Sequence, residues 1–179
     1  VKILLTTNPI LFFISPRFGI IMRRHNQSRE PSERQRVCRR QPKCVLQALH
    51  SLSRELTPLG YRCEAINARD TISGDWGKNA SLYVVPGGAD LPYCRTLSGG
   101  GNDRIREFVE RGGTYLGLCA GGYFGASFVE FDKGYPLEVC GERELKFFSV
   151  TAIGPALGSG TYEYDSEKGA REVSIRWEP

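Results

Sequence analysis

The residues of this chain best suited to chemistry surround Cys119, which follows a short apolar run and is flanked by small residues. The segment from Gly112 to Gly125 reads Gly-Gly-Thr-Tyr-Leu-Gly-Leu-Cys-Ala-Gly-Gly-Tyr-Phe-Gly. Glycines two positions before and after a cysteine are typical of a nucleophile elbow, a tight strand-to-helix turn that tolerates little bulk. The N-terminus of the following helix offers N–H groups and favours negative charge. The pattern predicts that Cys119 forms a thiolate readily and can attack a carbonyl.

The cysteines also allow a plainer interpretation, in which Cys119 is a buried small hydrophobic residue of a glycine-rich connection. Six cysteines occur at positions 38, 44, 63, 94, 119 and 140, without a C-x-x-C pair and with only two histidines. This spacing argues against a structural zinc site. It fits a reduced cytoplasmic protein better than a disulfide framework. We therefore expect no metal, and Cys94 and Cys140 to be structural.

The positive charge of the chain is concentrated near its N-terminus. Residues 1–43 carry a balance of +8, whereas residues 44–179 carry −4. A basic arm can bind nucleic acid or an anionic membrane, but this one lacks interleaved aromatics and no nucleic-acid motif follows. The apolar stretch 3–22 is interrupted by polar residues and prolines, so it is too broken to span a bilayer. We predict a basic, poorly ordered arm at 1–41 and one domain at 42–179, truncated at its C-terminus if the fold continues past Pro179.

The elements expected to position Cys119 alternate between strands and helices. The predicted order is a helix through Val45 to Leu56, strands at 61–66 and 82–85, a helix capped by Asn102 and ended by Gly112-Gly113, and a strand at 114–118. Parallel strands require right-handed crossovers, which brings the C-terminal ends of the last two strands together. Ligands of open α/β sheets bind at that edge. The loop Gly87-Gly88-Ala89-Asp90 is therefore expected to face Cys119.

The remaining segments predict further strands of antiparallel character, divided by glycine and proline turns. These strands are 128–131, 136–140, 144–150, 161–164 and 172–177. Within the polar passage 67–79, Trp76 is expected to cover an edge of the core. Glu130, Glu138, Glu142 and Glu144 form no carboxylate pair or metal pattern, which indicates solvated strand faces.

The sequence around the two glycine loops resembles a known family. Residues 84–91 read Val-Val-Pro-Gly-Gly-Ala-Asp-Leu, and residues 119–123 read Cys-Ala-Gly-Gly-Tyr. With Gly101-Asn102, Glu130-Phe131 and Arg143-Glu144-Leu145, these motifs resemble the class I glutamine amidotransferase-like superfamily. More narrowly, they resemble the N-terminal domain of fungal-type biotin–protein ligases, over roughly residues 42–175. The resemblance implies an α/β fold, a flavodoxin-like three-layer sandwich with a mainly parallel central sheet.

The resemblance also implies roles for individual residues. Cys119 takes the nucleophile position, and the N–H groups of Gly88 and Ala120 take the oxyanion-hole positions, where fixed donors stabilise a negative oxygen. The other residues expected to line this oxyanion-type pocket are Gly87, Ala89, Asp90, Gly121, Gly122 and Tyr123. Asp90 either orients a ligand amine or stabilises its turn. Tyr93 and Arg95, on the same loop, either close over the pocket rim or lie on the surface.

The chain departs from the catalytic members of that superfamily. Glutaminases need a late His-x-Glu, yet no histidine follows His50, which a helical stripe places on the surface. Tyr123 stands where the glutaminase elbow has Gln, and Ala120 stands where the protease branch has His. Biotin activation belongs to a separate domain with an Arg/Gly-rich loop, and residues 98–101 lack the arginines of such a loop.

Two functions remain open from the sequence. The first is a biotin–protein ligase N-terminal-type domain that binds a small ligand or a ligase catalytic domain, without a complete Cys-His-Glu triad. The second is a thiol-dependent amidase or amidotransferase-like hydrolase whose histidine lies outside this chain. Neither needs a cofactor or a membrane, nucleic acid is not the expected partner, and no pattern fixes an oligomeric state.

Overall fold

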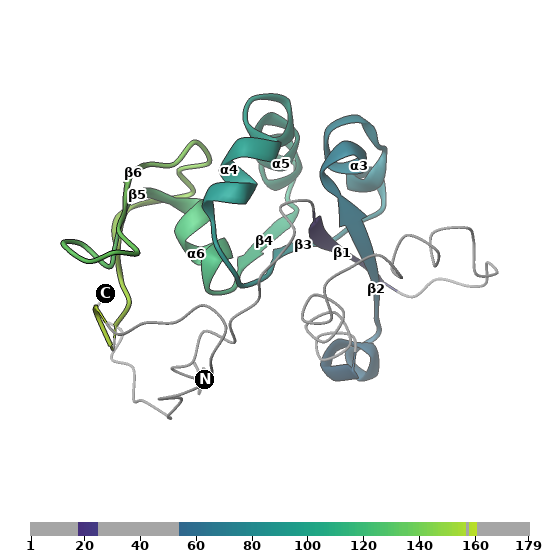
Figure 1. Cartoon of the computed structure of the whole chain (residues 1–179). Coiled ribbons are helices and arrows are strands. Elements are labelled where there is room, and N and C mark those ends of the chain that lie inside the picture. The colour runs from purple at the N-terminus through teal and green to yellow at the C-terminus, as the bar shows by residue number, and fades with distance from the viewer. Residues whose placement is uncertain (1–17, 25–53, 157, 161–179) are drawn as a thin grey trace.

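The structure consists of two small sheets with helices, shown in Figure 1. This computed structural model describes residues 18–24, 54–156 and 158–160. The strands are β1 (Phe18–Arg24), β2 (Tyr61–Asn67), β3 (Leu82–Val85), β4 (Thr114–Gly117), β5 (Ala126–Phe131), β6 (Val139–Glu142) and β7 (Phe148–Gly154). The helices are η1 (Thr57–Leu59), α3 (Ala68–Ser73), η2 (Trp76–Lys78), α4 (Leu91–Leu97), α5 (Gly100–Glu110) and α6 (Ala120–Gly125). The predicted α/β class is confirmed.

The first sheet has the strand order β2-β1-β3-β4. Strands β3 and β4 are parallel, with Val85 opposite Gly117, and the N–H of Leu118 extends the pairing to the Val85 carbonyl at 2.9 Å. The predicted meeting of these two strand ends is confirmed. However, β1 runs antiparallel to both β2 and β3, so the sheet is mixed rather than mainly parallel.

Strand β1 comes from the stretch that the sequence assigned to a poorly ordered arm. Residues 18–24 pair with 61–67 and with part of β3, far along the chain. Charge composition reports local tendencies, whereas strand pairing is decided by distant partners. The expectation of an arm is therefore wrong for these seven residues. The domain boundary at 41/42 stays a prediction.

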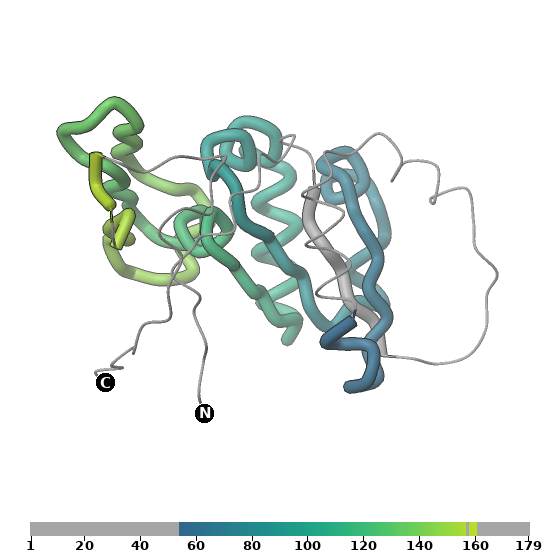
Figure 2. The backbone as a smooth tube through the Cα atoms, turned by 60° about the horizontal axis from the view of Figure 1, so that its bottom comes forward, coloured from purple at the N-terminus to yellow at the C-terminus, as the bar shows by residue number. Residues whose placement is uncertain are grey.

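Helices α3, α4 and α5 lie side by side on one face of the first sheet, as Figures 1 and 2 both show. Their core contains Tyr83, Ile105 and Phe108, which are buried. Trp76 is also buried and packs on Tyr83 and Phe108 with ring centroids 4.8 and 5.0 Å apart, which confirms its predicted place. On the other face, Val84 contacts residues that include Leu56 and Leu118. The three-layer sandwich stays a prediction.

Two helix starts differ from the sequence expectations. Helix α4 occupies residues predicted as a loop, and Pro92 near its start explains why, since proline suits a first helical turn. Helix α5 begins at Gly100 with Gly99 as its N-cap, so Asn102 lies inside the helix and is not the cap. A distant carboxylate causes this shift. Glu144 accepts hydrogen bonds from the N–H of Gly99 at 3.0 Å and from the Asn102 amide at 2.6 Å.

The second sheet has the order β6-β5-β7, with β5 antiparallel to β6 and parallel to β7. The predicted antiparallel character holds for one of these two pairings. The strand predicted at 144–150 occurs later in the chain, as β7 from Phe148 to Gly154. Arg143 and Leu145 lie before it and are buried. The predicted strands 161–164 and 172–177 lie outside the described residues. Most of the predicted helix before Gly60 also lies outside the described residues. Gly60, with a φ of +83°, is the C-cap residue of η1.

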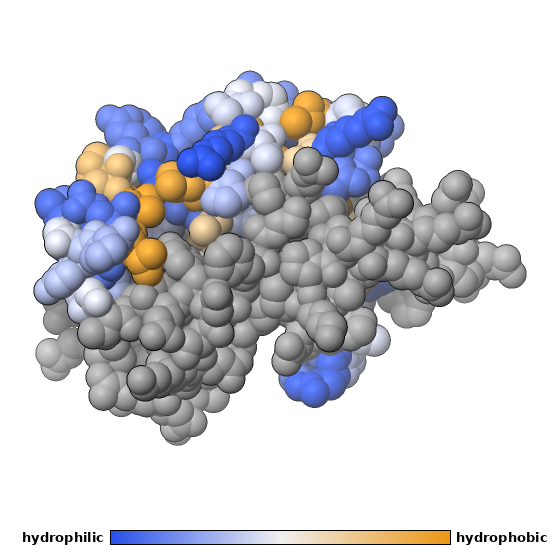
Figure 3. Space-filling model, in the orientation of Figure 1, coloured by the Kyte–Doolittle hydropathy of each residue, from blue (hydrophilic) through white to orange (hydrophobic). Residues whose placement is uncertain are grey.

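The visible surface in Figure 3 is mostly hydrophilic where the residues are described, with small apolar areas between charged ones. Among the described helices, none is both long enough and apolar enough to cross a membrane.

Candidate functional site

Cys119 lies in the tight turn between β4 and α6. Its backbone has φ 52° and ψ −111°, a left-handed conformation that only two other non-glycine residues of the described chain share. Such a conformation costs on the order of 1–3 kcal/mol, so the surroundings must enforce it. The Cys119 carbonyl accepts a hydrogen bond from the N–H of Gly122 at 2.8 Å, which starts the helix directly after the cysteine.

The two flanking glycines allow a close approach of three backbone segments. A Cβ atom on Gly117 would lie 2.4 Å from the Gly121 carbonyl oxygen. A Cβ atom on Gly121 would lie 2.1 Å from the Val85 carbonyl oxygen, at the end of β3. The hydroxyl of Tyr115 donates to the Gly121 carbonyl at 2.7 Å. Gly117 and Gly121 are therefore glycines because a side chain at either position would clash with the neighbouring backbone.

The Gly87–Asp90 loop, which follows β3, lies against Cys119. Gly87 and Gly88 are buried and Ala89 is half-buried, and Gly88 has a φ of +116° that favours glycine. The backbone N–H groups of Gly88 and Ala120 hydrogen-bond to the Cys119 sulfur. The structure thus brings together the cysteine and both donors that the resemblance assigned to an oxyanion hole.

The environment of Cys119 nevertheless disfavours a thiolate. Burial raises the pKa of Cys119, the nearby Asp90 carboxylate raises it further, and the Gly88 and Ala120 N–H groups lower it without reversing the shift. The prediction of an easily formed thiolate is contradicted. The sequence showed a helix N-terminus after the cysteine, but it could not show the burial that outweighs it.

Asp90 forms a buried ion pair with Arg143, a residue that the sequence analysis named only within the family resemblance and without a role. The Arg143 Nε donates to Asp90 Oδ2 at 2.6 Å, and the two side chains are 3% and 10% exposed. The Arg143 Nη1 donates to the carbonyls of Gly141 and Glu142 at 3.0 and 2.9 Å. Asp90 makes no capping hydrogen bond to its own turn, so that alternative is wrong. No local signal marks Arg143, because its partner lies 53 residues away.

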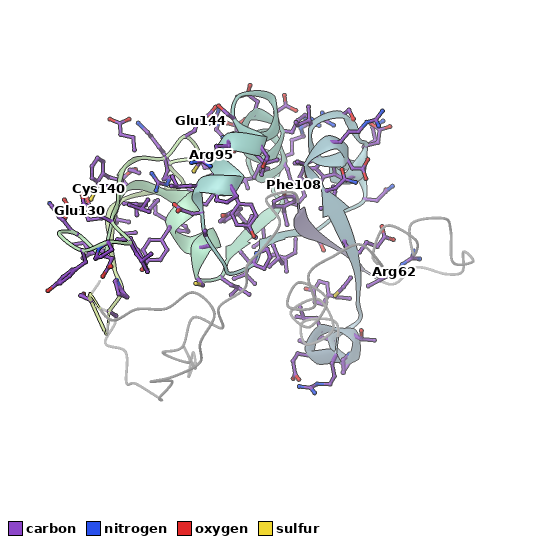
Figure 4. All side chains as sticks on the ribbon, in the orientation of Figure 1. Arg62, Arg95, Phe108, Glu130, Cys140 and Glu144 are labelled. Carbon is purple, nitrogen blue, oxygen red and sulfur yellow. The ribbon has the colours of Figure 1, made fainter. Side chains whose placement is uncertain are left out.

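The two predicted rim residues lie on helix α4, not on a loop. Tyr93 is buried, and its hydroxyl donates to the Gly87 carbonyl at 3.4 Å, so it supports the loop from inside the core. Arg95 is exposed on α4, as Figure 4 shows. Beyond the cysteine, Gly121 is buried, Gly122 and Tyr123 are half-buried, and Tyr123 packs edge-on against Phe131.

The other chemically capable residues lie apart from this site. Glu130 pairs with Lys133, Glu142 pairs with Lys146, and Cys140 is exposed on the second sheet, where Figure 4 shows it near Glu130. Glu144 is exposed, as expected for a solvated residue, but it lies in the β6–β7 connection and not on a strand, and it hydrogen-bonds to the start of α5. The described residues contain no group of three His, Cys, Asp or Glu side chains that could hold a metal ion. His25 and His50 lie outside these residues.

Comparisons with known proteins decide the family. The family model described as "Biotin-protein ligase, N terminal" matches residues 40–179. This chain belongs to that family. It is 42% identical over 133 residues to the biotin–protein ligase of Schizosaccharomyces pombe, covering 74% of this chain and 21% of the relative. It is 41% identical over 102 residues to an uncharacterized protein of Chlamydia muridarum, covering 57% of this chain and 39% of the relative.

The chain therefore spans about a fifth of the S. pombe ligase and two fifths of the C. muridarum protein. No solved structure matches it. The resemblance to the biotin–protein ligase N-terminal domain, stated on the two glycine loops, is confirmed by this family match.

A pair of neighbouring glycines tests the steric account of the turn. We expect Gly121→Ala to lower the free energy of unfolding by about 1–3 kcal/mol, because the added methyl meets the Val85 carbonyl. The control is Gly122→Ala, whose added Cβ would meet only the Gly117 oxygen at 3.9 Å. It should be neutral or stabilising by up to about 1 kcal/mol, because alanine favours helices. Urea unfolding followed by circular dichroism measures both, and equal effects would contradict the account.

The pKa shift of Cys119 predicts slow alkylation at neutral pH. Since burial and Asp90 raise the pKa of this thiol, its thiolate fraction at pH 7.5 should be lower than that of a cysteine in an unstructured peptide with blocked termini. Its reaction with iodoacetamide, followed by peptide mass spectrometry, should rise only at a higher pH than that of the peptide thiol. A midpoint below that of the peptide thiol would show an activated cysteine instead.

Proposed function

We propose that this chain is a small-ligand-binding, regulatory domain of the biotin–protein ligase type. In this proposal its fold is the flavodoxin-like, three-layer fold of class I glutamine amidotransferases. Cys119 occupies the nucleophile elbow of that fold, and the Gly88 and Ala120 N–H groups hold an oxygen atom of the ligand. The ligand class is a carboxylate or an amide, because such oxygens accept two converging N–H donors.

One observation carries this proposal, namely that two backbone N–H groups from separate loops hydrogen-bond to the sulfur of a half-buried thiol whose pKa is raised. The donors come from the β3–α4 loop and from the start of α6, and both elements are fixed by buried contacts. Donors held in a low-dielectric site bind an oxygen without reorganising. The raised pKa of Cys119 supports binding rather than covalent attack.

The alternative, a thiol-dependent hydrolase, requires a base that takes the Cys119 proton. The titratable groups that act electrostatically on Cys119 include Asp90, which is already engaged by Arg143. In this alternative the histidine lies outside this chain, and His25 and His50 lie outside the described residues. We keep this function as the competing outcome of the experiment below.

The partner we propose is a biotin ligase catalytic domain. The relative from S. pombe is a biotin–protein ligase of which this chain matches 21%, which supports association with the remainder of such an enzyme. On β7, Phe148, Val150 and Ile153 are at least half exposed, a feature typical of surfaces that dock another domain. We further propose a cytoplasmic location, since Cys94, Cys119 and Cys140 are free thiols.

Ligand protection of Cys119 tests the binding function. A panel of carboxylates and primary amides, including biotin and glutamine, is added at saturating concentration during iodoacetamide labelling at pH 9. We expect at least one member to slow labelling of Cys119 about tenfold or more, because the ligand covers the thiol. Cys140, exposed on β6, is the control inside the same chain and should label at an unchanged rate.

The same preparation tests the hydrolase. Ammonia release from glutamine and from simple amides should stay at background for the wild-type chain and for Cys119→Ser. Turnover that Cys119→Ser abolishes would overturn the binding function in favour of the enzyme. A panel that leaves Cys119 labelling unchanged would also count against it.

Association with the catalytic domain can be measured by titration calorimetry with a separately produced ligase domain. We expect binding that Ile153→Glu weakens, because a charge on the exposed β7 face would have to be desolvated. Lys133→Glu, which changes an exposed charge in the β5–β6 connection, is the control and should bind as the wild type does. Binding that is absent, or equally affected by both changes, would contradict this partner.

A further inference from the structure

We propose that Arg143 is the positioning residue of the Cys119 site, because it anchors Asp90 and thereby holds the Gly88 N–H against the sulfur. This inference rests on the proposed function and adds a residue from the second sheet to the site. Arg143 lies in the connection between β6 and β7, whereas Cys119, Gly88 and Asp90 belong to the first sheet and its loops. The site would then be assembled from both parts of the molecule.

Arg143 anchors the end of the Gly87–Asp90 loop through Asp90. Asp90 comes two residues after Gly88, at the N-terminus of α4. Its carboxylate is joined to the Arg143 Nε at 2.6 Å, and both side chains are nearly inaccessible to solvent. A buried charge needs its partner, so Arg143 cannot leave Asp90 without exposing both groups to an apolar surrounding. The end of the Gly87–Asp90 loop is therefore fixed in place.

Hydrogen bonds hold Arg143 itself in place. Its Nη1 donates to two carbonyls of its own connection, and its backbone N–H donates to the Ser127 carbonyl on β5 at 3.0 Å. The next two residues hold the same connection against the first sheet. Glu144 is bound to the start of α5, and Leu145 is buried in the core of the first sheet. A rigid guanidinium on a rigid connection can position what it binds.

The Nη2 group of Arg143 is a further hydrogen-bond donor. Its Nη2 is buried and has no hydrogen-bond partner among the described residues. Buried guanidinium nitrogens are normally paired, so a group that stays unpaired in a folded protein calls for a function. A role at the site explains why an arginine stands here, where a shorter cation would suffice to neutralise Asp90.

The charged and titratable groups around the pair are few. Cys94 comes from α4 and lies within electrostatic reach of Asp90, Arg143 and Glu144. Cys119 comes from the β4–α6 turn and is affected by Asp90. The Tyr93 hydroxyl donates to Gly87 in the same loop, and the Tyr115 hydroxyl donates to Gly121. Burial, together with the charge of Asp90, raises the pKa of Cys94 to about 11.

The test compares variants that change the anchor in different ways. Asp90→Asn keeps an acceptor for Arg143 and removes the negative charge beside Cys119. The double variant Asp90→Asn with Arg143→Met also removes the anchor and buries no ion. Arg143→Lys keeps the charge but loses the planar fork. Each is labelled with iodoacetamide between pH 6 and pH 11, and the rate at Cys119 is read by peptide mass spectrometry.

We expect Asp90→Asn to move the Cys119 profile to lower pH, because a charge that disfavours the thiolate is gone. In the double variant the profile should move back to higher pH. At pH 8 its labelling should be about fivefold slower than in Asp90→Asn, the size expected for one lost hydrogen bond. The pH profile of Cys119 labelling in Arg143→Lys should lie between that of the wild type and that of the double variant. Identical profiles for Asp90→Asn and the double variant would overturn the inference.

A matched control separates positioning from loss of stability. Thr71→Val removes the hydrogen bonds of Thr71 to Tyr83 and to the Asn67 carbonyl, in helix α3, which packs against β2. It should lower the melting temperature and leave the Cys119 profile unchanged. If Thr71→Val moves that profile as the double variant does, Arg143 is only structural.

The outcome also separates this inference from the proposed function. A wild-type Cys119 that labels like a free thiol, with no response to Asp90→Asn, would remove the site itself. A wild-type profile shifted to high pH, with a response to Asp90→Asn but none to loss of Arg143, would overturn the positioning role alone.

Discussion

The close approach of three backbone segments at the β4–α6 turn is the constraint on which the rest of the structure depends. The end of β3, the end of β4 and the start of α6 meet so tightly that the Gly121 position has no room for a methyl group. This contact forces Cys119 into its left-handed conformation and aims the Ala120 N–H at the sulfur. A strained backbone of this kind persists only where packing on all sides maintains it.

The second constraint is the connection Arg143-Glu144-Leu145, which joins the two sheets. These three residues contact different parts of the first sheet and its helices. Arg143 binds the Gly87–Asp90 loop, Glu144 binds the start of α5, and Leu145 packs in the apolar core. Two of these contacts are charged and one is apolar, so they differ in their response to pH and to salt. Because the pair with Asp90 is almost fully buried, solvent ions screen it little.

These two constraints give the site its chemical character. Two N–H donors converge on a thiol that burial keeps protonated, and the nearest carboxylate is neutralised by an arginine. An activated nucleophile requires the opposite arrangement, a depressed pKa or an adjacent base. The chain belongs to the biotin–protein ligase N-terminal family and spans about a fifth of the S. pombe ligase that it matches.

The sequence by itself determined the elements whose signals are local. The apolar run of β3, the strands β2 and β4, the helix α5 and the glycines around Cys119 could all be predicted. Each depends on periodicity or on the steric needs of a turn, which a short stretch of chain displays. The family likeness followed from the same loops, since their glycines and Asp90 are its most specific motif.

Only the tertiary structure decided the features that join distant residues. The insertion of β1 between β2 and β3, the capping of α5 by Glu144 and the pairing of Arg143 with Asp90 all link residues more than 35 positions apart. The pKa of Cys119 belongs to this group, because burial is a property of the packed molecule and not of its neighbours in sequence. The sequence could place the cysteine and its donors, but the balance between burial and hydrogen bonds, which decides the chemistry, exists only in the folded chain.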